Sequence, residues 1–281
     1  MEFTKKDMYE YQIEAEMEKT FYDLGAERLG YPSIVASGDN ACILHYSTNR
    51  EKVDNNGLIL IDAAAEFKMY SSDVTRTFPV NGKFTKVQKD VYTEVLKAQE
   101  IGIKNVTTKK TMSDIHTSTV ASISQSLVDL GLVPMGVEET ISMMHYFEFF
   151  MHGTGHWLGL DVHDAGTTEE KNKPRKLKPG MVTTIEPGIY IRPNKPEIEF
   201  KLLERDPKKI RERRKSLGME KATKLESEEM KDAKSIKHKI PKDLLGIGIR
   251  IEDDIVCTEN DPINLTIGAP KTIDDVEAIC S

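Results

Sequence analysis

Cysteine and long apolar runs are the two features of which this sequence has least. The three cysteines, Cys42, Cys257 and Cys280, are too few and too scattered for a disulfide framework or a cysteine-based zinc site. No stretch approaches the ~18 consecutive apolar residues of a membrane-spanning helix, and the first residues carry no apolar signal segment. We therefore expect a protein of the reducing cytoplasm with no membrane partner.

The chain as a whole also lacks a basic balance. Its 281 residues contain 46 acidic and 39 basic side chains, a net charge of −7. Because binding to a phosphate backbone needs a basic face, this balance argues against a nucleic-acid partner. Hydrophobic residues make up 38% of the chain, which is enough for one large core or two ordinary ones.

Apolar periodicity predicts helices and short strands along the whole chain. Helical spacing runs through residues 7–29, about 85–104 and 111–130, and Gly131 is a natural stop for the third helix. Short apolar runs bounded by turn residues predict strands at 30–38, 58–61, 74–80, 182–185, 188–191 and 248–251. Strands tipped with acidic residues recur in each half, so we predict an α+β fold with two pseudo-equivalent halves.

Residues 194–245 differ in composition from the rest of the chain. They hold 16 basic and 11 acidic side chains, a net charge of +5, which leaves −12 on the remainder. Widely spaced apolar residues interrupted by Pro207 and Gly218 predict one or two surface helices. We interpret the segment as a solvated helical insertion; the alternative is a basic docking surface for an acidic partner.

Four carboxylates stand at the ends of predicted strands. Asp62 ends one apolar run and Asp73 precedes the next, so a hairpin would bring the two together; Glu186 and Glu252 follow later apolar runs. A buried carboxylate is costly unless it is protonated, ion-paired or bound to a cation. Any one of them could be a cap or an ion pair, but four of them with a histidine predict a metal site.

Three of the seven histidines, His152, His156 and His163, fall in one glycine-rich segment. Gly153 stands where a zincin needs its catalytic glutamate, and the glycine spacing does not fit a dinucleotide-binding loop. We expect these glycines to let the backbone pass close to a metal and a substrate. Four carboxylates and one imidazole suit two divalent ions that share a water, with Mn²⁺ favoured and Co²⁺, Fe²⁺ or Zn²⁺ as alternatives.

Longer motifs extend this pattern over nearly the whole chain outside the insertion. They occupy residues 8–14, 37–46, 72–84, 156–164, 186–190 and 248–254. In these motifs the sequence resembles the catalytic pita-bread domain of the methionine aminopeptidase/creatinase family of metallopeptidases, and within it the aminopeptidase P (Xaa-Pro aminopeptidase) branch. The resemblance implies a single pita-bread domain over residues 1–281, with the insertion at about 194–245.

The same resemblance implies a role for each candidate residue. The implied ligands of two metal ions are Asp62, Asp73, His156, Glu186 and Glu252. The implied catalytic residues are His45, His152, His163, Glu186 and Arg250. Among these, Glu186 would relay a proton to the leaving nitrogen, His152 and His163 would hydrogen-bond the peptide carbonyl, and Arg250 would hold a ligand carboxylate.

The implied activity is the release of the N-terminal residue from peptides with proline in the second position. Peptides of this kind are the expected partners, and a homo-oligomer is compatible with the resemblance. Relatives usually carry a further N-terminal domain, and because the match begins within the first ten residues, we expect that domain to be absent. The insertion lies on a connection that is short in typical relatives.

Three other functions remain open at this stage. A prolidase (Xaa-Pro dipeptidase) would use the same ligands, although Trp157 after the ligand histidine favours aminopeptidase P. Methionine aminopeptidases share the ligand order but lack the segment 157–164. Non-catalytic binding modules with this fold typically lose ligands, and all five are present here.

Overall fold

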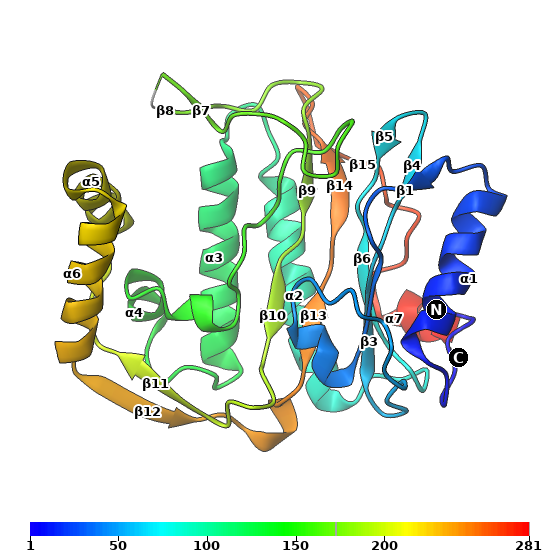
Figure 1. The fold of residues 1–281 in the computed structure, drawn as a ribbon, viewed down its shortest axis with the longest axis horizontal. Coiled ribbons are helices and arrows are strands. Elements are labelled where there is room, and N and C mark those ends of the chain that lie inside the picture. The colour runs from blue at the N-terminus through cyan, green and yellow to red at the C-terminus, as the bar shows by residue number, and fades with distance from the viewer. Residues whose placement is uncertain (172, 281) are drawn as a thin grey trace.

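Strands from both halves of the chain lie side by side and are backed by helices in the computed structural model, which describes residues 1–171 and 173–280 (Figure 1). The α-helices are α1 (Glu10–Asp23), α2 (Lys86–Lys104), α3 (Met112–Asp129), α4 (Val137–Ser142), α5 (Pro207–Leu217), α6 (Met219–Asp232) and α7 (Ile273–Cys280). The strands are β1 (Arg28–Leu29), β2 (Ile34–Ser37), β3 (Leu58–Asp62), β4 (Ala65–Phe67), β5 (Tyr70–Ser71), β6 (Thr75–Pro79), β7 (Glu169–Glu170), β8 (Lys173–Pro174), β9 (Val182–Ile185), β10 (Gly188–Tyr190), β11 (Glu197–Lys201), β12 (Ser235–Lys239), β13 (Gly248–Arg250), β14 (Asp253–Val256) and β15 (Ile263–Asn264). Within the described ranges, no helix is both long and apolar enough to cross a bilayer.

Each half contributes a three-stranded antiparallel sheet that carries site residues at its end, and the first half has a further small sheet, β1–β4–β5. The order is β2–β3–β6 in the first half and β15–β14–β9 in the second, and β10 pairs with β13. The predicted strands at 58–61, 74–80, 182–185, 188–191 and 248–251 are confirmed as β3, β6, β9, β10 and β13. In the region 30–38 the strand begins only at Ile34, after Pro32, whose nitrogen cannot donate to a ladder.

The strand pairing brings the acidic strand ends together. Strand β3 runs antiparallel to β6 with Asp62 opposite Thr75, so Asp62 and Asp73 lie at the same end of the sheet although β4 and β5 intervene in the sequence. Glu186 lies between β9 and β10, and Glu252 lies between β13 and β14. The Glu252 N–H donates to the Thr75 carbonyl at 3.1 Å, which joins the second half to the first.

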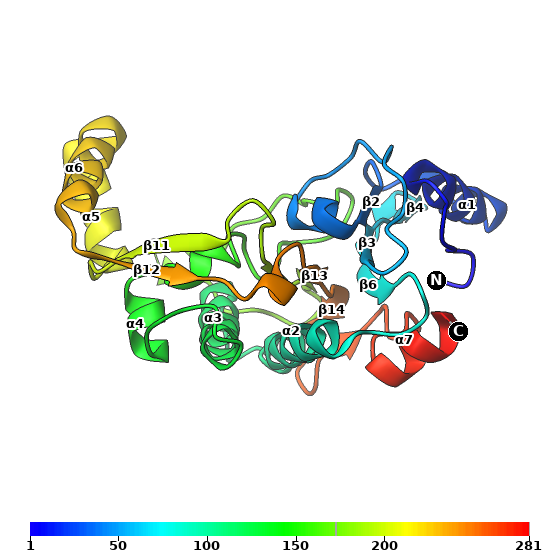
Figure 2. The same cartoon turned by 90° about the horizontal axis from the view of Figure 1, so that it is seen from below.

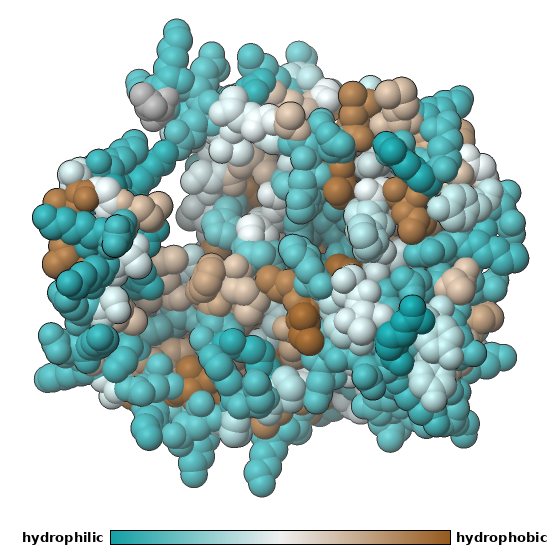
Figure 3. Space-filling model, in the orientation of Figure 1, coloured by the Kyte–Doolittle hydropathy of each residue, from teal (hydrophilic) through white to brown (hydrophobic). Residues whose placement is uncertain are grey.

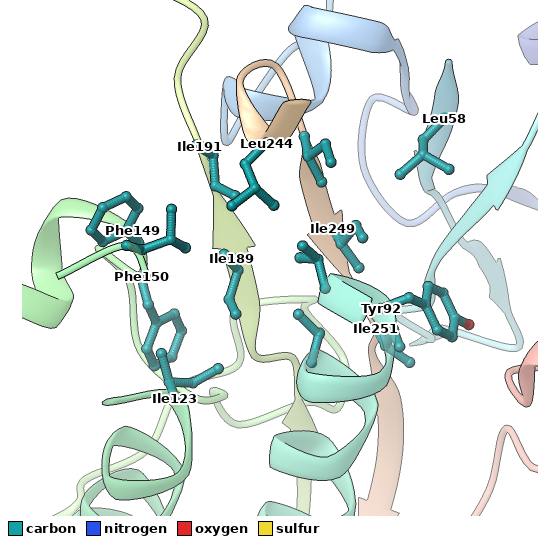
Figure 4. Close-up of a cluster of buried hydrophobic side chains, with 14 of the residues drawn as sticks. Leu58, Tyr92, Ile123, Phe149, Phe150, Ile189, Ile191, Leu244, Ile249 and Ile251 are labelled. Carbon is teal, nitrogen blue, oxygen red and sulfur yellow. The ribbon is translucent and has the colours of Figure 1, made fainter. Parts of the chain in front are cut away.

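The three predicted helices are confirmed as α1, α2 and α3. Thr85 and Thr111 cap α2 and α3 by accepting hydrogen bonds from Gln88 and Asp114, and Gly131 follows α3 with a φ of +68°. Figure 2 shows α2 and α3 along one side of the strands, and Figure 4 shows the buried side chains between them.

The side chains of β13 and the two residues after it alternate between the helices and the cleft. Ile249 and Ile251 are fully buried in the core with Tyr92 of α2 and Ile123 of α3 (Figure 4). Burial of an aliphatic side chain contributes roughly 1.5–3 kcal/mol, so these residues hold the strand against the helices. Because neighbouring side chains point to opposite faces, Arg250 and Glu252 face away from the helices.

The charged segment 194–245 consists of a hairpin and two helices. Strands β11 and β12 pair antiparallel, and Ile198 and Phe200 of β11 are buried in the main core. Helices α5 and α6 connect these two strands. The helix breaks fall at Pro207 and Gly218, where the sequence predicts them. We call residues 202–234 the arm; Figure 1 and Figure 2 show it standing away from the body at the left.

Candidate metal centre

One cavity of about 640 Å³ contains every site residue that the sequence predicts. It opens between the two halves of the chain. Its lining includes His45, Asp62, Asp73, His152, His156, His163, Glu186, Arg250 and Glu252. Residues that are up to 207 positions apart in the sequence, from His45 to Glu252, therefore face one space.

Three candidate ligands converge most closely. Ligand atoms of Asp73, His156 and Glu252 all lie within 4.8 Å of one another. His156 Nε2 is 3.3 Å from Asp73 Oδ2 and 3.6 Å from Glu186 Oε1. His156 Nδ1 lies 3.0 Å from the Trp157 carbonyl, so Nδ1 carries a proton and Nε2 is the nitrogen that faces the carboxylates.

Tyr31 links the two aspartates, and the sequence analysis did not predict its presence in the site. Its hydroxyl lies 2.5 Å from Asp62 Oδ1 and 2.5 Å from Asp73 Oδ1. Burial and the negative charges of Asp62 and Asp73 raise the pKa of Tyr31 well above its usual range, so the phenol keeps its proton. Because the phenol has a single proton, it bridges the two carboxylate oxygens through one shared hydrogen bond and holds them close together.

Arg250 is buried and organises the other side of the carboxylate cluster. Its Nη2 donates to Asp62 Oδ2 at 2.6 Å, its Nε to Thr75 Oγ1 at 3.0 Å and its Nη1 to the Tyr190 hydroxyl at 3.0 Å. Thr75 Oγ1 in turn donates to Glu252 Oε2 at 2.7 Å. One guanidinium thereby orients two carboxylates, one directly and one through a hydroxyl.

Both ring nitrogens of His152 already have protein partners. Nδ1 lies 2.8 Å from the Gly153 carbonyl, and Nε2 lies 2.8 Å from the Tyr190 hydroxyl. Because Arg250 donates to Tyr190, the consistent arrangement has Tyr190 donating to Nε2 and Nδ1–H donating to Gly153. Burial and the Arg250 charge lower the pKa of His152 to about 3, so its ring is neutral.

The glycine-rich segment passes close to strand β9. A Cβ at Gly155 would lie 1.8 Å from the Thr184 carbonyl oxygen, so only glycine fits there. The neighbouring His156 N–H donates to Thr184 Oγ1 at 3.1 Å. The expected close approach is thus present, but Gly155 approaches a strand backbone, which fixes the position of His156.

A polar pair supports this segment from the opposite side. His116 of α3 lies with Nδ1 2.9 Å from Thr154 Oγ1, and Thr154 is buried. The Thr154 carbonyl accepts the Glu186 N–H at 2.8 Å. His116 therefore supports the backbone that precedes His156 and positions Glu186, a role that the sequence analysis did not predict.

The carboxylates outnumber the positive groups that the chain supplies. Burial raises the pKa of Glu186 to about 7 although Arg250 and His156 oppose it, and burial with Asp73 and Glu186 raises that of Glu252 well above its usual range. Burial also raises the pKa of Asp254 to about 7; its Oδ1 has no partner among the described residues. An oxygen-rich cluster with one oriented imidazole and excess negative charge fits divalent ions.

Three further residues of the site could have been predicted from the alternation of side chains along strands. Thr75, Tyr190 and Asp254 each lie two positions after a strand or cluster residue: Asp73, Gly188 and Glu252. The period of two places such residues on one face, and this signal was available in the sequence. Tyr31 had no comparable signal because it precedes β2 in an irregular stretch.

Residues 1–259 match the family described as metallopeptidase family M24. The chain belongs to this family. An Xaa-Pro aminopeptidase of Haemophilus influenzae is 38% identical over 277 residues, which cover 99% of this chain and 54% of the relative. The Xaa-Pro aminopeptidase of Escherichia coli is also 38% identical, over 99% of this chain and 53% of its own length. This M24 chain therefore spans about half the length of the curated relatives it matches.

Solved structures confirm the fold. An aminopeptidase from Pseudomonas aeruginosa superposes with a TM-score of 0.82 at 38% identity, covering 99% of this chain and 54% of its own. An Escherichia coli aminopeptidase P in complex with substrate gives a TM-score of 0.80 at 37% identity. The M24 chain thus has the predicted mixed helix-and-sheet pita-bread fold.

Proposed function

We propose that this M24 chain removes the N-terminal residue from peptides with proline in the second position, as a metal-dependent aminopeptidase. The observation that carries the proposal is the convergence of Asp73, His156 and Glu252 at one side of a cavity that holds all the predicted site residues. The relatives are named Xaa-Pro aminopeptidases, which supports the proline-directed activity over other peptidase activities.

We assign two divalent ions to the carboxylate cluster. Their proposed ligands are Asp62, Asp73, His156, Glu186 and Glu252. When bound, such ions supply a more acidic water and a Lewis acid for the peptide carbonyl. The mixture of carboxylates with one imidazole supports Mn²⁺ over Mg²⁺, with Co²⁺, Fe²⁺ and Zn²⁺ as alternatives.

Glu186 is the proposed proton carrier between the attacking water and the leaving nitrogen. Its Oε1 faces His156 Nε2 at 3.6 Å and its Oε2 lies 3.7 Å from His152 Nδ1, so both oxygens lie in the cavity. Its backbone is held by the Thr154 carbonyl. A carboxylate so placed in the cavity can accept a proton from the water and donate it to the leaving nitrogen.

His163 and His45 are the proposed donors to the substrate. The ring of His163 packs edge-on against that of His156 at 4.4 Å, and burial together with His156 lowers its pKa, so it is a neutral donor. His152 reaches a peptide carbonyl only if that carbonyl replaces Gly153 as the acceptor of Nδ1–H. We place the free α-amino group of the substrate at the Asp62 end of the cavity.

We also propose a cytoplasmic location and weigh two alternative functions, a dipeptidase and a binding module. The thiols of Cys42, Cys257 and Cys280 are all free, which supports a reducing cytoplasm. A dipeptidase would use the same metal ligands, whereas a non-catalytic binding module would not need a functional metal site.

A peptide series separates these functions. Purified protein is treated with a chelator, then assayed on Xaa-Pro-Yaa tripeptides, Xaa-Pro dipeptides and Xaa-Ala-Yaa controls with and without Mn²⁺. We expect Mn²⁺-dependent release of the first residue from Xaa-Pro-Yaa and little cleavage of the other two. Cleavage confined to dipeptides would indicate a prolidase, and a folded protein that binds no divalent ion and cleaves nothing would indicate a binding module.

A further inference from the structure

A hollow of about 370 Å³ beside strands β7 and β8 is lined almost entirely by basic side chains. Five of its seven lining residues are basic and one is acidic. The basic ones are Lys171, Lys173, Arg175, Lys176 and Lys178. Four of these five are exposed, and none forms an ion pair within the described part of the chain.

Helix α5 of the arm brings a second basic element to the same place. Arg211 Nη2 contacts Glu169 of β7, so the arm and the β7–β8 hairpin adjoin although about 40 residues separate them. Arg213 and Arg214 of α5 are paired with Glu229 and Glu226 of α6. Lys208, Lys209 and Lys215 are exposed and have no ion pair among the described residues.

These two elements form one surface, which we call the basic rim. It consists of Lys171, Lys173, Arg175, Lys176 and Lys178 with Lys208 and Lys215, which share the helix face of Arg211. Figure 1 shows β7–β8 and α5 at the same upper end of the molecule, and Figure 3 shows hydrophilic side chains on both sides of the open gap between arm and body.

The basic rim lies a few residues along the chain from the segment that lines the cleft. A smaller hollow of about 330 Å³ shares Gly153, Gly155, His156 and His163 with the main cavity and extends to Thr168. The Thr168 carbonyl accepts the N–H of Arg175 at 2.8 Å, and Arg175 belongs to the rim. The backbone that lines the cleft at His163 thus leads directly to the rim.

The charge of the rim is opposite to that of the molecule around it. Outside residues 194–245 the chain carries −12, and the metal centre itself is built from carboxylates. An acidic polypeptide is therefore repelled by most of this surface and attracted at the rim, because local fields steer charged ligands even when the net charge opposes them.

We propose that the basic rim binds an acidic stretch of the peptide substrate, several residues beyond the proline, and so selects acidic substrates. This inference rests on the proposed function, because the bound stretch belongs to a peptide whose N-terminus occupies the metal centre. Since an extended chain spans about 3.3 Å per residue, the preference depends on the spacing between the proline and the acidic stretch.

Three peptide families test the proposal on the metal-loaded enzyme. Each peptide begins Xaa-Pro, continues with two to eight Gly and Ser residues and ends with three Glu, three Gln or three Lys. We expect kcat/KM at low ionic strength to be about fivefold higher for Glu than for Gln at the best spacing, and lower for Lys than for Gln. At 0.5 M salt the three should converge, because exposed charges are screened.

Charge reversals locate the effect. Lys171→Glu with Lys173→Glu, and separately Lys208→Glu with Lys215→Glu, should remove the preference for Glu while leaving hydrolysis of an Xaa-Pro-Yaa tripeptide unchanged. The control is Lys5→Glu with Lys6→Glu, two exposed residues near the N-terminus, at the other end of the molecule (Figure 1). It makes the same change in net charge and should retain the preference.

Other outcomes overturn the proposal in recognisable ways. If the tripeptide is cleaved but Glu, Gln and Lys peptides react alike at every spacing, the rim does not bind substrate. If the rim reversals instead change the sedimentation coefficient with no effect on peptide preference, the rim is an interface between copies of the chain. If no Xaa-Pro-Yaa peptide is cleaved, the proposed function itself fails.

Discussion

One glutamate on the arm and one in the cleft have pKa values shifted in opposite directions by their surroundings. Glu226 on the arm accepts hydrogen bonds from Arg214 at 2.7 and 3.3 Å, and these lower its pKa. Glu186 in the cleft is surrounded by other carboxylates, and its burial raises its pKa to about 7. The arm pairs several of its charges with partners on the adjacent helix, whereas the cleft concentrates negative charge that the chain does not balance.

The difference teaches where charge serves stability and where it serves binding. Exposed pairs such as Arg213–Glu229 contribute about 0–1 kcal/mol each, so the arm depends little on any one of them. Buried charges cost far more when they lose a partner. A chain that keeps such a cluster in its cleft retains it for a ligand of opposite charge.

The largest expected effect is on the cluster itself. We expect Asp73→Asn to lower kcat/KM for an Xaa-Pro-Yaa peptide by roughly a thousandfold or more, because it removes a carboxylate that faces both His156 and Tyr31. Metal content and circular dichroism are measured on the same sample. Asp232→Asn on the exposed face of the arm is the matched control and should keep full activity; retained activity in Asp73→Asn would remove the basis of the ligand assignment.

A pair of arginine substitutions compares the two regions by stability. Arg250→Met strips Asp62, Thr75 and Tyr190 of their donor, and we expect a loss of about 3–5 kcal/mol in the free energy of unfolding. Arg214→Met on the arm should cost less than about 1 kcal/mol. Urea unfolding measures both, and equal losses would mean that burial does not separate the regions.

The pH dependence of stability sharpens the same contrast. Above pH 6.5 the neutral His152 contributes no further change, whereas Glu186 and His156 have pKa values raised to about 7 and about 9. Groups with raised pKa values hold protons in the folded state, so their contribution is lost as pH rises. We expect the chelated protein to lose stability between pH 6.5 and 9, by up to about 1.4 kcal/mol per pH unit for each proton.

Added divalent ion should flatten this slope, because it replaces the protons as the balancing charge. Urea unfolding at pH 6.5, 7.5 and 8.5, with chelator and with Mn²⁺, provides the comparison. Stability that rises over this range in the chelated protein would contradict the assignment of raised pKa values to the cluster.

The smallest effect is expected for the hydrogen bond between His116 and Thr154, which supports the metal-binding segment from the side of α3. His116→Leu or Thr154→Val removes one hydrogen bond worth about 1 kcal/mol, so we expect roughly a fivefold fall in kcat with little change in KM. The double variant should be no worse than either single one, because the two residues act as a pair. Fully additive losses would show that His116 does not act through Thr154.

Much of the site could be predicted because its residues stand out locally. Asp62, Asp73, Glu186 and Glu252 are acids at the ends of apolar runs, and the clustered histidines lie among glycines. The support of these residues could not be predicted in the same way. Tyr31, His116 and Thr154 are ordinary in their local sequence, and their roles depend on contacts over 31 to 42 positions.

The arm shows the same division. Its helices and their breaks at Pro207 and Gly218 follow from local spacing and turn chemistry. The attachment of the arm to the body does not follow from local sequence. Ile198 and Phe200 of β11 enter the main core, and β11 pairs with a strand that lies 35 or more residues beyond them along the chain.

By itself the sequence determined which side chains are available, which strands and helices form, and which family the motifs resemble, because these depend on short-range spacing. Only the tertiary structure decided that nine predicted site residues face one cavity, that Arg250 holds Asp62, and that the arm adjoins the β7–β8 hairpin. The physical reason is that strand pairing and core packing bring together residues whose sequence separation carries no local signal.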